Sequence, residues 1–172
     1  MQTIAIITLV YSSLATIRQI DFKALVAYSS IAHMAVIILG LFSNTIIGIE
    51  GGYLLSLAHG LVSPALFMLI GGVLYDRFPS RIVVYYRGLV VYIPVFACLF
   101  FLAACANIAV PLSLNWISEF IALAGAFQRS PVVGVLGSSG IVLSACYTIW
   151  LWSRMVNGTW SPYLNYTVDV TR

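Results

Sequence analysis

The 172-residue chain is 62% hydrophobic and only 8% charged, with a mean hydropathy of +1.04 and a formal net charge of +3. A soluble domain carries about a quarter charged residues, so this composition excludes a water-soluble globule and predicts an all-α integral membrane protein. The basic residues form no stripe or cluster, which excludes a nucleic-acid-binding surface.

Apolar segments follow one another along the chain. Because about 20 apolar residues cross a bilayer as a helix, we predict helices over residues 2–17, 24–42 and 50–75, and a final helix over 131–152. The tract over residues 89–128 has a single charged residue and is too long for one straight span. It forms either two spans joined by a turn or one broken span.

The distribution of basic residues bears on that choice. Five spans put seven of the eight basic residues on one side and only Arg129 on the other, whereas six spans split them six to two. The positive-inside rule therefore favours five spans, with the N-terminus outside and the tail inside. Residues 1–152 are then predicted to form a transmembrane bundle, and residues 153–172 a polar tail on the membrane surface.

Three ionisable residues fall inside the predicted spans: His33, His59 and Glu119. A charged side chain at the bilayer centre costs about 2.5–3.5 kcal/mol on insertion scales, so such residues need an internal partner or a wet cavity. Their positions on three different spans predict a hydrogen-bonded proton path. A metal site is disfavoured, because no HxxxH or ExxH spacing accompanies them. No redox or group-transfer motif is present, so no catalytic residue is predicted.

His33 lies inside the second predicted span, with Ser29 and Ser30 four and three residues before it. These spacings place both hydroxyls on the face of the helix that carries the imidazole. Two interpretations stay open at this point. His33 is either a proton carrier or a hydrogen-bonding residue that joins neighbouring helices.

His59 lies near the middle of the third predicted span, flanked by Ser56 and Ser63. Pro64 leaves the carbonyl of Gly60 without its usual partner, and a kink there would open room for water beside the imidazole. Neutral imidazole both accepts and donates protons near physiological pH. We therefore interpret His59 as a proton-transfer residue.

Glu119 shares a helical face with Asn115, just after an interruption formed by Asn107 and Pro111. Broken helices are tolerated at membrane depth where they line a cavity, and transporters use them to build ion sites. A structural pair with Arg129 is the alternative, but ten residues span about 15 Å on a helix. We therefore interpret Glu119 as a group that binds and releases protons.

A further pair of charges, Asp21 and Lys23, precedes the second span. We interpret Asp21 as a helix cap or dipole partner and Lys23 as a side chain that extends toward the membrane surface.

Three motifs carry a resemblance to a known family. RQIDFKALVAYSSIAHM (18–34), AHGLVSPALF (58–67) and ANIAVPLSLNWISEF (106–120) resemble segments of the antiporter-like subunits of respiratory complex I, the proton-pumping NADH:ubiquinone oxidoreductase. Asn115 and Glu119 followed by phenylalanine resemble the M-type pattern of subunit 4, whereas subunits 2 and 5 carry a lysine there.

The resemblance implies a fold and a role. It implies five helices equivalent to the family's helices 9 to 13, one of them discontinuous, in a multi-pass protein of the mitochondrial inner membrane. His33 and His59 resemble the family's hydrophilic-axis histidines, and Glu119 its terminal proton-exchange carboxylate. NADH, FMN, iron–sulfur clusters and ubiquinone are expected elsewhere in the complex. The implied partners are lipids, neighbouring antiporter-like subunits and other membrane-arm subunits.

The chain also departs from the family's pattern. A full member has 14 helices, and its first half supplies a glutamate–lysine pair and a further lysine that have no counterpart here. The sequence is therefore expected to be either a separately encoded C-terminal half that docks with an N-terminal partner chain, which Met1 favours, or a fragment. Two other functions stay open: a subunit of a related cation/proton antiporter or membrane-bound hydrogenase, and a purely structural scaffold.

Overall fold

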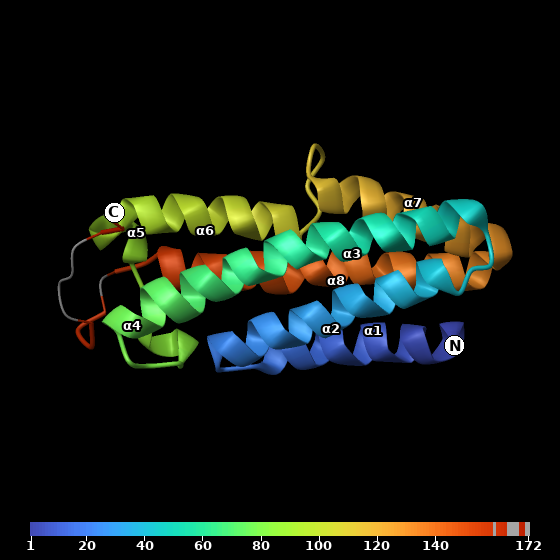
Figure 1. Ribbon diagram of the computed structural model, residues 1–172. Coiled ribbons are helices and arrows are strands. Elements are labelled where there is room, and N and C mark those ends of the chain that lie inside the picture. The colour runs from blue at the N-terminus through green and yellow to red at the C-terminus, as the bar shows by residue number, and fades with distance from the viewer. Residues whose placement is uncertain (160, 165–168, 171–172) are drawn as a thin grey trace.

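The computed structural model describes residues 1–159, 161–164 and 169–170 of the chain. Its elements are helices, and the long ones run along a common axis (Figure 1). In chain order they are α1 (Gln2–Arg18), α2 (Phe22–Leu41), α3 (Ile46–Phe67), the π-helix η1 (Met68–Leu74), α4 (Tyr75–Arg77), the 3-10 helix η2 (Val83–Tyr85), α5 (Leu89–Tyr92), α6 (Pro94–Asn107), α7 (Leu114–Arg129) and α8 (Pro131–Val156).

Three helical segments are long and apolar enough to cross a membrane: Phe22–Leu41, Ile46–Arg77 and Pro131–Val156. Gln2–Arg18 and Pro94–Asn107 are shorter apolar helices. The protein is therefore an all-α membrane protein, as its composition predicts.

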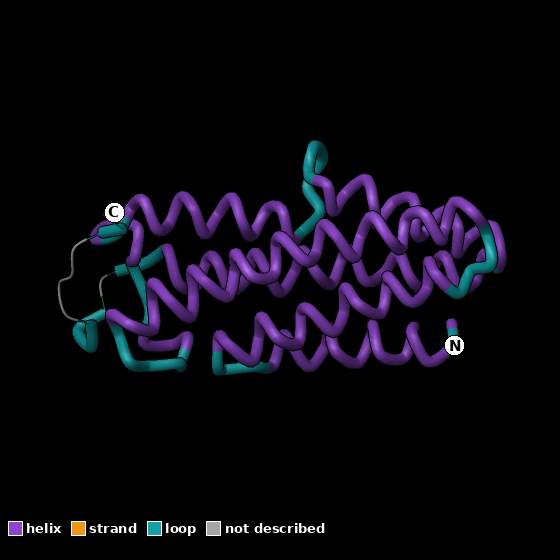
Figure 2. Tube along the Cα trace, in the orientation of Figure 1, coloured by secondary structure: helices purple, strands orange, loops and turns teal. Residues whose placement is uncertain are grey.

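The predicted broken span corresponds to α6 and α7. They follow one another along the same side of the bundle, separated by a loop that projects away from the other helices (Figures 1 and 2). In that loop Ala109 (φ 62°) and Leu112 (φ 80°) adopt the left-handed backbone conformation, which a helix cannot include. Ser113 then caps α7 by accepting a hydrogen bond from the backbone N–H of Trp116, at 3.2 Å. The chain thus passes along the bundle five times rather than six.

The third helical segment begins at Ile46 and continues through Pro64, which lies within α3. Four residues later the segment changes to the π-helix η1, and it ends at Arg77. The helix predicted over 50–75 is thus longer at both ends. π-helical turns are rare and relieve a local mismatch in the hydrogen-bond ladder, so the irregularity expected at Pro64 falls one turn further along.

Two charged residues, Asp21 and Lys23, lie at the start of α2. The Asp21 carboxylate accepts hydrogen bonds from the backbone N–H groups of Lys23 (2.8 Å) and Ala24 (3.4 Å), which confirms its role as a cap. The Lys23 ammonium has an aromatic partner. It lies 3.8 Å from the centre of the Tyr75 ring, a cation–π contact that ties α2 to α4.

The loop after α4 is held by one buried tyrosine. The Tyr86 hydroxyl donates to the carbonyl oxygens of Phe78 (2.8 Å) and Ser80 (2.7 Å). Burial raises the pKa of Tyr86 to about 12, so the phenol stays protonated and remains a donor at physiological pH.

Helix α3 packs most extensively against α7, and glycines make that contact possible. A Cβ atom on Gly51 would meet the backbone of Ala122, with its Cα at 2.8 Å, and a Cβ on Gly125 would overlap the backbone of Gly48. Small residues at these positions let the two backbones approach closely, as they do at many membrane helix interfaces. This contact fixes the height of Glu119 relative to α3.

Asp169 attaches the described part of the tail to the start of α6. Its carboxylate accepts hydrogen bonds from the backbone N–H groups of Val95 (2.8 Å) and Phe96 (3.3 Å), while Arg77 donates to its carbonyl oxygen at 3.3 Å. The predicted tail, 153–172, starts later than expected, because α8 continues to Val156.

We expect Asp169→Ala to release this contact at a cost of about 1 kcal/mol. Partial burial raises the pKa of Asp169, but the backbone donors and the Arg77 charge outweigh it and hold the pKa below its usual value of 3.8. A lowered pKa stabilises the contact above pH 3.8, and the contribution is lost as pH falls through the lower folded value. The strength of the contact is measured as protection of the Val95 and Phe96 amides from hydrogen exchange. Protection that is already lost between pH 7 and pH 5 would contradict the lowered pKa of Asp169.

Candidate functional site

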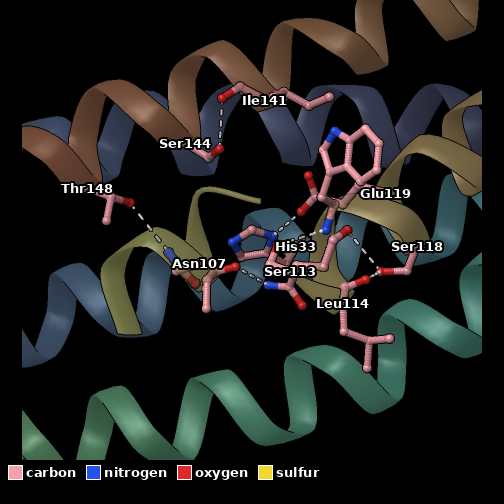
Figure 3. Close-up of polar contacts among 12 residues, drawn as sticks. His33, Asn107, Ser113, Leu114, Ser118, Glu119, Ile141, Ser144 and Thr148 are labelled. Carbon is pink, nitrogen blue, oxygen red and sulfur yellow. Dashed lines mark hydrogen bonds and ion pairs between the residues drawn. The ribbon is translucent and has the colours of Figure 1, made fainter. Parts of the chain in front are cut away.

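Two of the three predicted ionisable residues meet directly. The Nδ1 atom of His33 on α2 lies 2.9 Å from Oε1 of Glu119 on α7 (Figure 3). Both side chains are almost fully buried, with relative exposures of 3% and 4%. Within the part of the chain that the structure describes, this is the only ion pair. The alternative pairing of Glu119 with Arg129 is thus wrong.

The pair has a definite chemical character. A carboxylate accepts a hydrogen bond from Nδ1–H, whereas a carboxylic acid donates to an unprotonated Nδ1. The same contact therefore suits either location of the proton. The hydrogen bond is therefore preserved whichever of the two side chains carries the shared proton.

His59 lies beside His33. The two ring centres are 5.6 Å apart with their planes tilted by 43°. The Nε2 atoms of both rings are buried and have no hydrogen-bond partner in the protein. His59 is half-buried on α3, so the three residues form a row from α3 through α2 to α7.

The serines predicted to support the histidines bond elsewhere. Ser30 and Ser63 bond to each other across α2 and α3 at 3.0 Å. Ser29 donates to the carbonyl of Val26, and Ser56 to that of Tyr53. Sequence spacing placed these hydroxyls near the imidazoles along the chain, but the carbonyls one turn earlier are closer acceptors.

The two asparagines lie at the helix break and are buried. Asn107 donates to the Thr148 hydroxyl on α8 at 3.4 Å, and Asn115 donates to the Ala106 carbonyl at 3.0 Å (Figure 3). The second bond satisfies a carbonyl that the interruption leaves without a helical partner. Pro111 lies in the loop between them and is exposed. The break thus positions the first turn of α7, and Glu119 follows one turn later.

Glu119 also borders a larger pocket between α7 and α8. The pocket has a volume of about 450 Å³, and its lining is mainly apolar, including Pro111, Trp116 and Phe120. Glu119 also borders a small internal cavity together with His33. The residue therefore contributes to the lining of both spaces.

One polar residue at this site was missed in the sequence. Tyr147 on α8 is 1% exposed, borders the same internal cavity as Glu119, and its hydroxyl has no partner in the protein. Tyr147 and Thr148 lie three and four residues after Ser144 within an apolar helix. That periodicity predicts a single polar face and is the signal that identifies Tyr147.

No group of three His, Cys, Asp or Glu side chains gathers as a metal site anywhere in the described ranges. The fold and the buried ionisable row together define the class of the protein: an all-α membrane protein that holds a titratable pair at the break of a discontinuous helix.

The chain belongs to the NADH:quinone oxidoreductase/Mrp antiporter transmembrane family, whose model matches residues 1–144. NADH-ubiquinone oxidoreductase chain 4 of Mycosarcoma maydis is 67% identical over 171 residues, 99% of this chain and 35% of the relative. The corresponding chain 4 of Marchantia polymorpha is 49% identical over 160 residues, 93% of this chain and 32% of the relative. The chain thus spans about a third of the length of these curated relatives.

Solved structures give the same fold. A chain of respiratory complex I from Thermus thermophilus with bound NADH has a TM-score of 0.86 and 31% identity, over 97% of this chain and 35% of that one. A chain of the Mrp complex from Dietzia sp. DQ12-45-1b has a TM-score of 0.84 at 19% identity, over 95% of this chain and 32% of that one. The second likeness concerns the fold alone.

Proposed function

We propose that this chain is part of a chain 4-type subunit of proton-translocating NADH:ubiquinone oxidoreductase in the mitochondrial inner membrane. The contact between His33 Nδ1 and Glu119 Oε1, with His59 beside it, carries the proposal. The names of the relatives supply the reaction to which the proton movement is coupled. The chain's own contribution is proton transfer. NADH, FMN, iron–sulfur clusters and ubiquinone belong to other subunits.

The proposed path uses both nitrogens of the His33 ring. A proton that reaches His59 passes through a bridging water to Nε2 of His33, because the ring centres are 5.6 Å apart and neither Nε2 atom has a hydrogen-bond partner in the protein. His33 is then doubly protonated and gives the proton on Nδ1 to Glu119. Glu119 releases this proton toward the other aqueous side. His33 is left with its proton on Nε2, and exchange of that proton through water, with uptake of one at Nδ1, restores the starting tautomer. No atom other than hydrogen moves, so the step needs no redox group in this chain.

The proposed partners follow from the length covered. Relatives are about three times as long as this chain, so we propose that the remaining two-thirds of such a subunit packs against the exposed face of α3 beside His59. Other membrane-arm subunits and lipids cover the rest. Five passes place Arg18, Arg81 and Arg154 near the same end of the bundle. By the positive-inside rule that end faces the matrix, and the N-terminus faces the intermembrane space.

His59→Gln tests the path in the assembled complex. Glutamine is polar and of similar size but does not titrate, so we expect proton translocation in sealed vesicles to fall by about 10²-fold, the scale of a lost acid–base group. Leu57→Val, a conservative change of an exposed neighbour on α3, is the matched control. Assembly is checked on a native gel. Translocation equal to that of the control would support a scaffold and contradict the proposal.

Cation/proton antiport is the second candidate, because the family model covers Mrp antiporters as well as NADH:quinone oxidoreductases. Sodium-driven proton exchange in vesicles without NADH would support antiport over NADH-coupled proton translocation. Under the proposed function, proton movement requires NADH oxidation and is independent of sodium.

A further inference from the structure

A small internal cavity lies between α1, α2, α7 and α8. It is bordered by His33, Glu119, Ser144 and Tyr147, with apolar side chains completing its wall. The cavity leaves about 10 Å³ for the centre of a water-sized sphere, which is about the least that holds one water molecule. Nothing larger than a water fits.

The polar groups around this cavity are incompletely hydrogen-bonded. The Tyr147 hydroxyl is buried and has no partner in the protein, although a buried phenol normally finds one. The Glu119 carboxylate offers about four acceptor positions, and His33 occupies one of them. The Ser144 hydroxyl donates to the Ile141 carbonyl at 2.8 Å, which leaves its oxygen free to accept. Two or more polar partners are what a buried water requires.

We propose that this cavity binds one structural water, which Tyr147 and Glu119 hold between them, and that Tyr147 is a positioning residue for the Glu119–His33 pair. This inference rests on the proposed function for its significance, but the site itself does not depend on it.

The positioning role of Tyr147 follows from the order in which Tyr147, the water, Glu119 and His33 are hydrogen-bonded. The water accepts a hydrogen bond from the Tyr147 hydroxyl and donates one to the Glu119 carboxylate. The carboxylate is then held from α8 through the water, on the side facing the cavity, while His33 holds it from α2. Without the hydroxyl, Glu119 has one fewer constraint and is free to turn toward the apolar pocket that it also borders.

Tyr147→Phe in the assembled complex tests this, because it removes one oxygen and keeps the ring. High-resolution electron cryomicroscopy is expected to show density for one water beside Tyr147 in the unmodified complex and none in the variant. Tyr53→Phe, at an exposed tyrosine on α3, is the matched control and retains the density. An empty cavity in the unmodified complex overturns the water site.

Infrared difference spectra give a readout that a merely structural tyrosine does not affect. The carboxyl stretch of Glu119 is assigned as the band that Glu119→Gln removes, and it is expected to shift to higher frequency in Tyr147→Phe. We also expect proton translocation to fall several-fold relative to Tyr53→Phe. An unshifted band together with unchanged translocation overturns the positioning role.

The two proposals fail in different ways. If His59→Gln leaves translocation unchanged, the proposed function fails, but the water density still decides whether the site exists. If His59→Gln lowers translocation while Tyr147→Phe leaves both translocation and the Glu119 band unchanged, the proton path stands and the positioning role fails.

Discussion

Glu119→Gln is expected to slow proton translocation by about 10²-fold while the complex still assembles. Glutamine keeps the shape of the side chain, and its amide can still hydrogen-bond to Nδ1 of His33, 2.9 Å from the original oxygen. The fold therefore loses little. The amide cannot take up or release a proton, however, so the path ends at His33.

Glu50→Gln is the matched control, because Glu50 is the chain's other glutamate and is exposed on α3. Translocation is measured as the initial rate of vesicle acidification per NADH oxidised, with the amount of assembled complex determined in parallel. Equal rates in the two variants would show that Glu119 is not on the path. A loss of assembly in Glu119→Gln alone would indicate that the carboxylate is structural.

Gly125→Ala is expected to destabilise the bundle by about 1–3 kcal/mol, the usual cost of overpacking a filled core. The added methyl group would overlap the backbone of Gly48 on α3, and backbone atoms cannot rotate away as a side chain can. A larger residue, as in Gly125→Leu, is expected to prevent assembly.

Gly60→Ala provides the comparison on α3 itself. A Cβ atom at position 60 would meet nothing within 4 Å. The substitution therefore changes only the helix propensity, which favours alanine over glycine by about 1 kcal/mol. The midpoint of thermal denaturation in detergent is expected to fall for Gly125→Ala and to rise slightly or stay unchanged for Gly60→Ala. Equal midpoints for the two variants would mean that α3 and α7 are not in backbone contact.

The apolar segments and the residues that interrupt them predicted much of the fold. Uninterrupted apolar stretches predicted α1, α2 and α8 to within a few residues, because bilayer thickness sets the length of such segments. The interruption around Pro111 predicted the break between α6 and α7. The π-helix over Met68–Leu74 was not predicted, because no residue type in that stretch marks a π-helical turn.

The sequence singled out three candidate site residues but not the contacts between them. A buried charge is costly enough that His33, His59 and Glu119 stand out by position alone. Their pairing was not predicted, because it depends on how α2 and α7 are rotated about their axes. Tyr147 was overlooked because a tyrosine in an apolar helix is common, although it shares a polar face with Ser144 and borders the same cavity as Glu119.

The glycine contact between α3 and α7 also has a mechanical consequence. Two helices whose backbones touch at Gly51 and Gly125 cannot slide or roll past each other without collision. The helix that carries His59 and the helix that carries Glu119 therefore behave as one stiff body. Gly40 packs α2 closely against the same two helices, so any cycle of opening and closing at this point has to come from side-chain rotation.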